Sequence, residues 1–235
     1  MKLHNATVLI TGANRGLGLA FAREALSRGA RKVYAGARDP ASVTLPGVEP
    51  IALDVNDPEQ VAAAARLGND VTLVINNAGI AALGSFLGED SIDSARRHMD
   101  TNFFGVLRVS QAFAPVLAAQ GGGAILNVLS VASWINSPLL AVYGASKSAA
   151  WALTNGLRND LRAQGTQVLG LHMGFVDTDL TRGIDMPKST PDEIVRRAFD
   201  ALEAGADEVL ADELTQQVKR GLSAEPGIYL RDARA

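Results

Sequence analysis

Cysteine is absent from the 235-residue chain. Its absence excludes disulfide bonds, thiol catalysis and metal sites built on cysteine, and we expect no metal cofactor. An excess of positive charge is also missing, because the formal net charge is −3. The chain therefore gives no electrostatic reason to expect binding to nucleic acid or to an anionic membrane surface.

Long apolar runs are missing as well, since none approaches the roughly 18 residues that a membrane-spanning helix needs. The first residues, "MKLHNATVLITGANRG", lack the basic start, apolar stretch and cleavage site of a secretory signal. What is present is 47% hydrophobic and 20% charged residues, an ordinary balance for a globular protein. We expect a soluble, cytoplasmic protein with no membrane association.

Short apolar runs alternate with longer helix-like segments. The predicted strands are residues 7–10, 32–37, 49–55, 71–77, 124–130, 167–173 and 208–211. The predicted helices cover about residues 16–28, 57–67, 91–119, 143–163 and 191–204. Most strand candidates are continuous apolar runs, which is typical of strands covered on both faces. The pattern predicts one α/β domain over residues 1–235, a doubly wound, Rossmann-type parallel sheet of about seven strands with helices on both faces.

The segment "TGANRGLG" follows the first predicted strand. Gly12, Gly16 and Gly18 fall in a strand-to-helix turn, where missing Cβ atoms let the backbone approach a phosphate group at the helix N-terminus. Their G-x3-G-x-G spacing differs from the common G-x-G-x-x-G fingerprint. Glycines in a turn can be purely structural, but the place after the first strand of an α/β pattern favours phosphate binding.

Three further polar motifs interrupt the apolar pattern. "NNAG" (76–79) closes the fourth predicted strand, "DTNFFG" (100–105) puts Asn102 in an apolar helix, and "NVLSVAS" (127–133) offers two serines just past a strand. Each has a structural interpretation: a turn with a glycine stop, an Asn that satisfies backbone groups, and a serine that caps a helix. The place just past a strand is also where α/β folds bind ligands.

Residues 143–147 read "YGASK". Four residues make about one helical turn, so the Tyr143 phenol and the Lys147 ammonium share one face of a helix. The neighbouring residues are small or apolar. A cation beside a phenol in such a setting suggests that the two side chains have a chemical function.

Taken in order, "TGANRGLG", "LDV", "NNAG", "TNFFG", "NVLS", "YGASK" and "GFVDT" resemble the motifs of the short-chain dehydrogenase/reductase family, in its compact branch, over essentially the whole chain. Asn102 precedes Ser130 by 28 residues, and Ser130 precedes Tyr143 by 13. With Lys147, these separations match the family's Asn–Ser–Tyr–Lys catalytic set. The resemblance implies an oxidoreductase that interconverts a carbonyl and an alcohol by hydride transfer.

The roles of the four residues follow from that resemblance. Tyr143 is the implied general acid, Ser130 polarises the carbonyl, and Asn102 anchors a water that relays protons to Lys147. An unperturbed phenol has a pKa near 10, poorly matched to a reversible reaction near neutral pH. We expect Lys147 to lower the pKa of Tyr143 and also to bind the nicotinamide ribose.

The resemblance also implies a nicotinamide dinucleotide. Its implied contacts are Gly12, Asn14, Arg15, Gly16, Leu17, Gly18, Arg38, Asp54, Val55, Asn76, Ala78, Gly79, Tyr143, Lys147, Gly174, Val176 and Thr178. Within this set, residues 54–55 contact adenine, residues 76–79 follow the ribose, and residues 174–178 fix the carboxamide. Two departures from the family pattern are Met173, where a Pro is common, and Leu129, where a second Ser is common. We expect His172, beside that loop, to be a packed strand residue and not a base.

The end of the second predicted strand bears on the choice of cofactor. An NAD site usually places a carboxylate there, to accept hydrogen bonds from the ribose hydroxyls. Here that place falls on Ala37, followed by Arg38, with Arg15 in the glycine turn. Two guanidinium groups suit a 2′-phosphate, so we expect NADP(H) in preference to NAD(H). A register slip that made Asp39 the terminal carboxylate would reverse the preference, but we interpret Asp39-Pro40 as a turn or helix start.

Helices 102–118 and 143–163 are apolar on more than one face, and the family resemblance implies a homodimer or homotetramer through them. An apolar substrate pocket for a lipophilic ketone, aldehyde or quinone is suggested by Trp134, Leu139, Leu140, Met173, Phe175 and Met186, although these residues could equally pack the core. Two other functions remain open. One is a dinucleotide-binding regulator without catalysis, and the other is a nucleotide-sugar epimerase, which usually has a larger C-terminal domain and G-x-x-G-x-x-G spacing.

Overall fold

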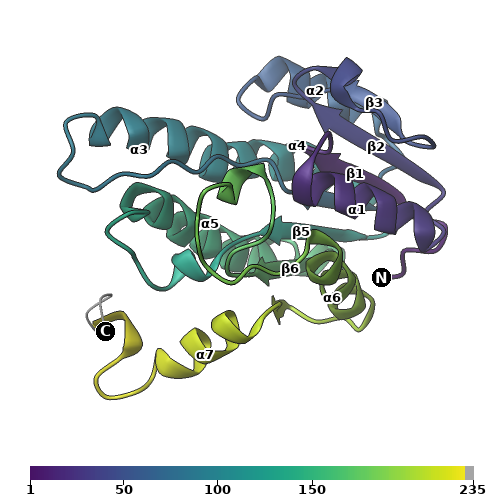
Figure 1. Cartoon of the computed structure of the whole chain (residues 1–235). Coiled ribbons are helices and arrows are strands. Elements are labelled where there is room, and N and C mark those ends of the chain that lie inside the picture. The colour runs from purple at the N-terminus through teal and green to yellow at the C-terminus, as the bar shows by residue number, and fades with distance from the viewer. Residues whose placement is uncertain (231–235) are drawn as a thin grey trace.

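The computed structural model describes residues 1–230. Its centre is a parallel sheet of seven strands in the order β3-β2-β1-β4-β5-β6-β7 (Figure 1). The strands are β1 (Thr7–Thr11), β2 (Lys32–Ala37), β3 (Glu49–Ala52), β4 (Leu73–Asn76), β5 (Ala124–Val128), β6 (Gln167–His172) and β7 (Glu208–Leu210). The order reverses between β1 and β4, so the predicted doubly wound sheet is confirmed.

Seven α-helices are assigned within residues 1–230. They are α1 (Gly16–Ser27), α2 (Pro58–Leu67), α3 (Ser91–Met99), α4 (Val106–Ala119), α5 (Ala141–Asp160), α6 (Pro191–Glu203) and α7 (Glu213–Gly221). Asp57 and Thr190 cap α2 and α6 with their side chains, and each is followed by a Pro at the first helical position. The predicted helix 91–119 is interrupted by a π-helical turn (Asp100–Gly105), and α7 was not predicted.

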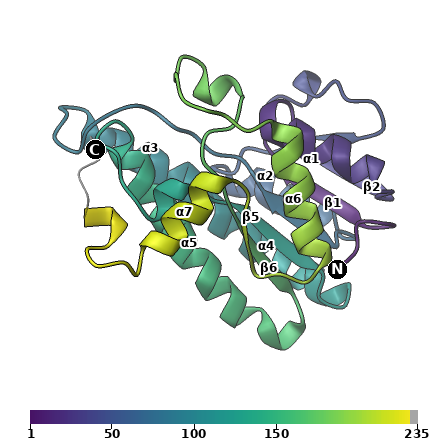
Figure 2. The same cartoon turned by 60° about the horizontal axis from the view of Figure 1, so that its bottom comes forward.

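Each face of the sheet is covered by helices (Figure 2). Ile10 and its neighbours on one face pack in a buried cluster with Phe21 of α1 and Phe199 of α6. Leu9 belongs to the opposite cluster, with Phe113 of α4 and residues of α2 and α5. Successive strand residues point to opposite faces, so a strand buried on both sides needs a continuous apolar run. This is the physical reason for the pattern by which the strands were predicted.

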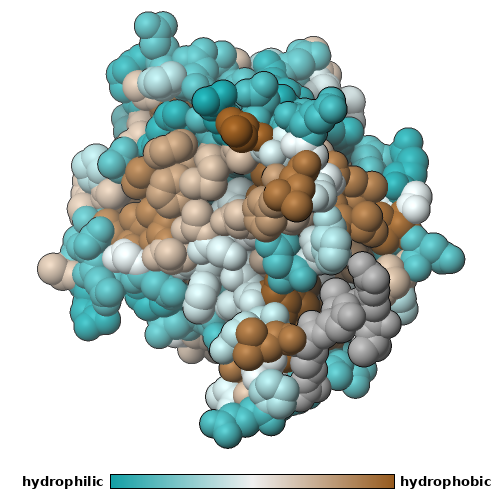
Figure 3. Space-filling model, turned by 90° about the vertical axis from the view of Figure 1, so that its left-hand side faces the viewer, coloured by the Kyte–Doolittle hydropathy of each residue, from teal (hydrophilic) through white to brown (hydrophobic). Residues whose placement is uncertain are grey.

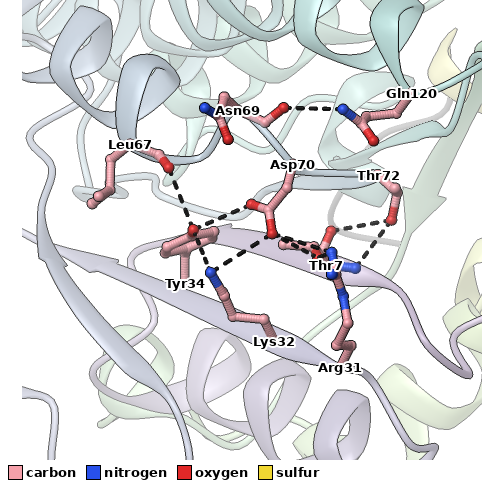
Figure 4. Close-up of polar contacts among 9 residues, drawn as sticks. All are labelled: Thr7, Arg31, Lys32, Tyr34, Leu67, Asn69, Asp70, Thr72 and Gln120. Carbon is pink, nitrogen blue, oxygen red and sulfur yellow. Dashed lines mark hydrogen bonds and ion pairs between the residues drawn. The ribbon is translucent and has the colours of Figure 1, made fainter.

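The amino ends of β1 and β2 are joined by a polar cluster around Asp70 (Figure 4). The Asp70 carboxylate pairs with Arg31 at 3.1 Å and accepts from the Tyr34 hydroxyl at 3.2 Å. Lys32 donates to the same hydroxyl at 2.9 Å, and Thr7 donates to the carboxylate at 3.4 Å. These contacts fix the edge of the sheet opposite the carboxyl ends of the strands.

Candidate functional site

The carboxyl ends of β1, β4, β5 and β6 bring the predicted motifs to one edge of the sheet. Gly12 follows β1, Asn77 follows β4, Ser130 follows β5 and Gly174 follows β6. The order reverses between β1 and β4, and in such sheets the ligand crevice forms at that point. Within residues 1–230, no group of three His, Asp or Glu side chains is placed to hold a metal ion, and no helix is both long and apolar enough to cross a membrane.

The glycine turn is packed closely against itself. Gly12 has a φ of +67°, a conformation that residues with a Cβ rarely adopt. A Cβ on Gly18 would lie 2.1 Å from the Gly12 carbonyl oxygen, so only glycine fits there. Asn14 and Leu17 are half-buried in the same turn. The Asn77 amide donates to the carbonyl oxygens of Thr11 and Gly12, at 2.9 and 3.0 Å, and was not among the predicted site residues.

Asn76 does not line this turn. Its side chain is buried and donates to Asn127 of β5 at 2.8 Å and to Ser110 of α4 at 3.2 Å. Only the backbone of Asn76 is left for the contact with the cofactor that was predicted. The Ala78 amide donates to the Thr11 hydroxyl at 2.9 Å. A Cβ on Gly79 would lie 3.2 Å from Asn102 Oδ1 and 3.8 Å from Lys147 Nζ, so this glycine lies beside the predicted catalytic residues.

Tyr143 and Lys147 lie one turn apart on α5, with Lys147 Nζ 5.8 Å from the centre of the Tyr143 ring. Lys147 donates to the carbonyl oxygen of Val128 at 2.9 Å, at the end of β5. Ser130 follows that strand, and its Oγ caps the short turn of residues 131–133 by accepting from Ala132 at 3.1 Å. Strand β5 therefore brings the serine and the lysine to the same end of the sheet.

Asn102 lies in the π-helical turn, almost fully buried. Its amide donates to the Ile80 carbonyl and to Ser146 Oγ, each at 2.9 Å, and its Oδ1 accepts from the Ile80 amide at 2.9 Å. Gly105 closes the turn against Val55, where a Cβ would meet the Val55 side chain at 2.7 Å. Such π-turns are frequent at functional sites, and this one turns Asn102 toward α5.

Burial governs the charges at this site. It raises the pKa of Tyr143 above 10.0, opposed by the hydrogen bond with the Ser130 side chain. Burial also lowers the pKa of Lys147 from 10.5 to about 8. Lys147 is not one of the groups that shift the pKa of Tyr143. The lowering that we expected from Lys147 is therefore not produced by the side chains of the protein. The phenol therefore stays protonated around neutral pH.

The predicted adenosine contacts lie after β2 and β3. Ala37 is buried at the end of β2, and Arg38 is exposed directly after it. The Asp39 carboxylate accepts from the Ala41 amide at 3.0 Å, in the turn role that the sequence predicts. Asp54 accepts in the same way from the Asn56 amide at 2.9 Å, and Val55 is buried against Gly105.

The segment after β6 lies over the glycine turn. A Cβ on Gly16 would be 3.4 Å from the Thr178 methyl group. Arg15 of the turn pairs with Asp179 at 3.3 Å. At the start of the segment, the Gly174 amide donates to the Asp212 carboxylate at 2.5 Å, and Val176 forms an isolated bridge with Ser189. The residues predicted to fix the carboxamide thus connect the glycine turn to α7.

His172 is fully buried, and burial lowers its pKa to about 3. Its ring stacks on Trp134 with 3.9 Å between centroids, and Trp134 meets Trp151 edge-on at 6.2 Å. Lys219 of α7 covers both indoles, 4.7 and 5.9 Å from their centroids. His172 is thus a packed strand residue, as predicted. We call these four side chains the tryptophan cluster.

The six side chains proposed for a substrate pocket differ in burial, and Leu140 and Phe175 are half-buried. Met173 belongs to the core and Trp134 to the tryptophan cluster. Leu139 and Met186 are exposed, at 66% and 54%. Further exposed apolar residues are Leu83, Phe86 and Leu87, in the loop before α3, and Figure 3 shows apolar surface on that side of the molecule.

A family model for short chain dehydrogenases matches residues 6–188. The curated relatives include oxidoreductase BOA17 of Botryotinia fuckeliana, 35% identical over 72% of this chain and 65% of that protein. The SDR family member 7B of Bos taurus is 31% identical over 76% of this chain and 60% of its own length. The match thus spans less than two thirds of these two relatives.

Solved structures with the same fold cover more of the chain. A short chain dehydrogenase of Burkholderia cenocepacia, in complex with NADP, is 38% identical with a TM-score of 0.94, over 99% of this chain and 100% of that one. A short chain dehydrogenase/reductase of Burkholderia phymatum, in complex with NAD, is 25% identical with a TM-score of 0.83, over 94% of each chain. Relatives of this fold therefore include complexes with either dinucleotide.

Proposed function

Since this chain belongs to the short-chain dehydrogenase/reductase family, we propose that it is an NADP(H)-dependent oxidoreductase that interconverts a carbonyl group and an alcohol. One observation carries the proposal. Ser130, Tyr143 and Lys147 converge at the carboxyl end of β5, and the glycine turn lies at the same edge of the sheet.

The residues present fit a dinucleotide. The turn at Gly12 and Gly18 has no room for a Cβ, and a Cβ on Gly79 would press against Asn102 Oδ1 at 3.2 Å, beside Lys147. In our proposal the turn holds the pyrophosphate, Lys147 binds the nicotinamide ribose, and residues 174–178 hold the carboxamide. When bound, the nicotinamide ring supplies or accepts the hydride.

The proton is handled by the protein. Because burial keeps the Tyr143 phenol protonated, Tyr143 is the acid that supplies the proton to the carbonyl oxygen in the reducing direction. Ser130 donates a hydrogen bond to that oxygen and orients it. Lys147 returns a proton to Tyr143 after each turnover and is resupplied through a water that Asn102 anchors, in the roles that the family resemblance implies.

The preference for NADP(H) is supported by the end of β2. Ala37 offers no carboxylate to the ribose hydroxyls, while Arg38 is exposed and Arg15, also exposed, is held only by its ion pair with Asp179. The Asp39 carboxylate accepts a hydrogen bond from the Ala41 amide within its turn. This contact disfavours the alternative in which Asp39 binds the ribose hydroxyls of NAD. The substrate we propose is a lipophilic ketone, aldehyde or quinone, because Leu83 and Leu139 are exposed on two loops that hydrogen-bond to each other, and the second loop leads into α5, which carries Tyr143.

The test is a panel of carbonyl compounds, with NADPH oxidation followed by absorbance. We expect turnover of at least one lipophilic member, and we expect Tyr143→Phe to abolish it without weakening the binding of NADPH. Lys147→Ala should reduce both turnover and binding, because the lysine serves the ribose as well. Binding of NADPH without turnover of any member would contradict the proposed reaction.

A further inference from the structure

The segment of residues 80–84 has little packing of its own. It follows the "NNAG" motif, Ala82 is exposed, and the Leu83 side chain is 67% exposed. Its place is set by hydrogen bonds from its backbone groups to four residues. Ile80 exchanges two with Asn102, Ala82 donates one to His98, and Gly84 bonds to Leu139 and Ala141.

His98 is a buried residue of α3 that none of the proposed steps uses. Its Nδ1 lies 2.8 Å from the Ser94 carbonyl oxygen, and its Nε2 lies 3.1 Å from the Ala82 amide nitrogen. A backbone amide can only donate and a carbonyl can only accept. The ring is therefore neutral with its proton on Nδ1, and both nitrogens are satisfied.

The residues that hold this segment also contact Tyr143 or its neighbours on α5. The Asn102 amide also donates to Ser146 Oγ, which donates to the Tyr143 carbonyl oxygen at 2.7 Å. The Ala141 amide donates to Gly84 in the first turn of α5, two residues before Tyr143. The His98 ring itself meets the Tyr143 ring edge-on, with 6.4 Å between centroids.

We propose that His98 is a positioning residue for the reaction. By accepting the Ala82 amide it fixes residues 80–84, and this segment holds Asn102 and the start of α5 in place around Tyr143. The inference rests on the proposed function, because the effect on turnover requires that Asn102 and Tyr143 act in catalysis. His98 touches neither the substrate nor the cofactor in this arrangement.

The experiment compares two substitutions that differ in one acceptor. In His98→Gln the side-chain oxygen can reach the position of Nε2, whereas in His98→Asn the shorter amide reaches only the Ser94 side. We expect His98→Asn to lower kcat about tenfold, as the loss of one buried hydrogen bond allows, and His98→Gln to stay within about threefold of wild type. The Kd for NADPH should not change in either variant.

Hydrogen exchange supplies a readout that does not depend on activity. The Ala82 amide should exchange faster in His98→Asn and recover its protection in His98→Gln. If wild type reduces no carbonyl, the proposed reaction fails, while exchange at Ala82 still tests the anchor. Equal losses in both variants, or faster exchange with unchanged kcat, would overturn the positioning role.

A second pair of substitutions avoids the buried residue in case His98→Asn does not fold. Ala82→Pro removes the donor N–H at an exposed position, and Ala82→Gly keeps it. We expect Ala82→Pro to lower kcat about tenfold and Ala82→Gly to change it less than threefold. Equal turnover in the two variants would also overturn the proposal.

Discussion

Lys147 is a cation in a place where burial disfavours its charge. Its side chain is buried, and its ammonium group makes one hydrogen bond, to the Val128 carbonyl oxygen. Burial lowers its pKa to about 8, so at neutral pH the folded protein still carries the charge and destabilises itself in doing so. Such a cost is expected of a lysine that serves the reaction proposed for this site.

Lys147→Met should therefore stabilise the protein at pH 7, by about 1–3 kcal/mol after the loss of the hydrogen bond to Val128. The folded-state pKa lies below the unfolded value, so lysine's unfavourable contribution is complete below pH 8 and disappears as the pH rises to 10.5. The measurement is the melting temperature of both proteins from pH 7 to pH 10. Lys2→Met, at an exposed lysine, is the control. A gain in melting temperature that is as large at pH 10 as at pH 7 would show that the buried charge of Lys147 is not its cause.

Asp179 would compete with the proposed 2′-phosphate for Arg15. The two side chains form an exposed ion pair, and Arg15 is one of the two arginines proposed for the 2′-phosphate. Asp179→Asn should lower the Kd for NADPH about two- to fivefold and leave the Kd for NADH unchanged, since exposed pairs are weak. Fluorescence titration measures both constants, and Asp185→Asn is the matched control in the same loop. An equal change for both dinucleotides would argue against Arg15 as a phosphate ligand.

At the residue scale, motifs predict where a residue lies in the fold better than they predict where its side chain points. The resemblance of the motifs to those of the family predicted that Ser130, Tyr143 and Lys147 act together, and in the structure all three lie at one edge of the sheet. The motifs could not show that Asn76 points into the core and Asn77 into the glycine turn, because that depends on which face of β4 each residue occupies. The pKa of Tyr143 was also beyond the sequence, since burial is a property of the packed structure.

At the scale of elements, the strands were predictable and two helical features were not. The five inner strands are marked by buried apolar runs, which burial on both faces requires, whereas the edge strands β3 and β7 are short and less buried. Helix α7 buries only Thr215 and Val218, so it has no apolar stripe, and its remaining signal is Asp212 as a cap. The π-turn lies in a continuous helical pattern, and the contact of Gly105 with Val55 that accompanies it is not local in the sequence.

Asp212 connects α7 to residues 174–178, the segment that we propose holds the carboxamide. One carboxylate oxygen accepts from the Thr215 amide at 2.8 Å and caps the helix, and the other accepts from Gly174. Asp212→Ala should cost about 1–2 kcal/mol of stability and raise the KM for NADPH, because Gly174 loses its partner. Asp212→Asn keeps a capping oxygen and should lose less of both. Chemical denaturation and kinetics measure the two effects, and loss of stability with an unchanged KM would exclude the link to the cofactor.

For the whole molecule, the outer face of α5 suggests a partner. Ala145 and Ala152 are exposed, and a Cβ on Gly156 would meet nothing within 4 Å. A glycine inside a helix costs about 1 kcal/mol, and no contact within residues 1–230 explains this one. Close packing against α5 of a second copy would explain it, in agreement with the association predicted through helices 102–118 and 143–163.

Ala152→Arg should then convert the oligomer to a monomer without lowering the melting temperature of the isolated chain. Light scattering at micromolar concentration measures the mass. Ala63→Arg makes the same change at an exposed position of α2 and should leave the mass unchanged. A wild-type protein that is already monomeric would refute the association.

The chain has only two tryptophans, and both belong to the tryptophan cluster. The intrinsic emission of the whole protein therefore originates from a single place, between the loop after Ser130 and α7. A nearby ammonium, that of Lys219, makes this emission sensitive to whether α7 is seated. In an unfolding experiment the optical signal should report the detachment of α7, while circular dichroism follows the sheet. Without any label, the protein thus carries a spectroscopic probe beside its candidate active site.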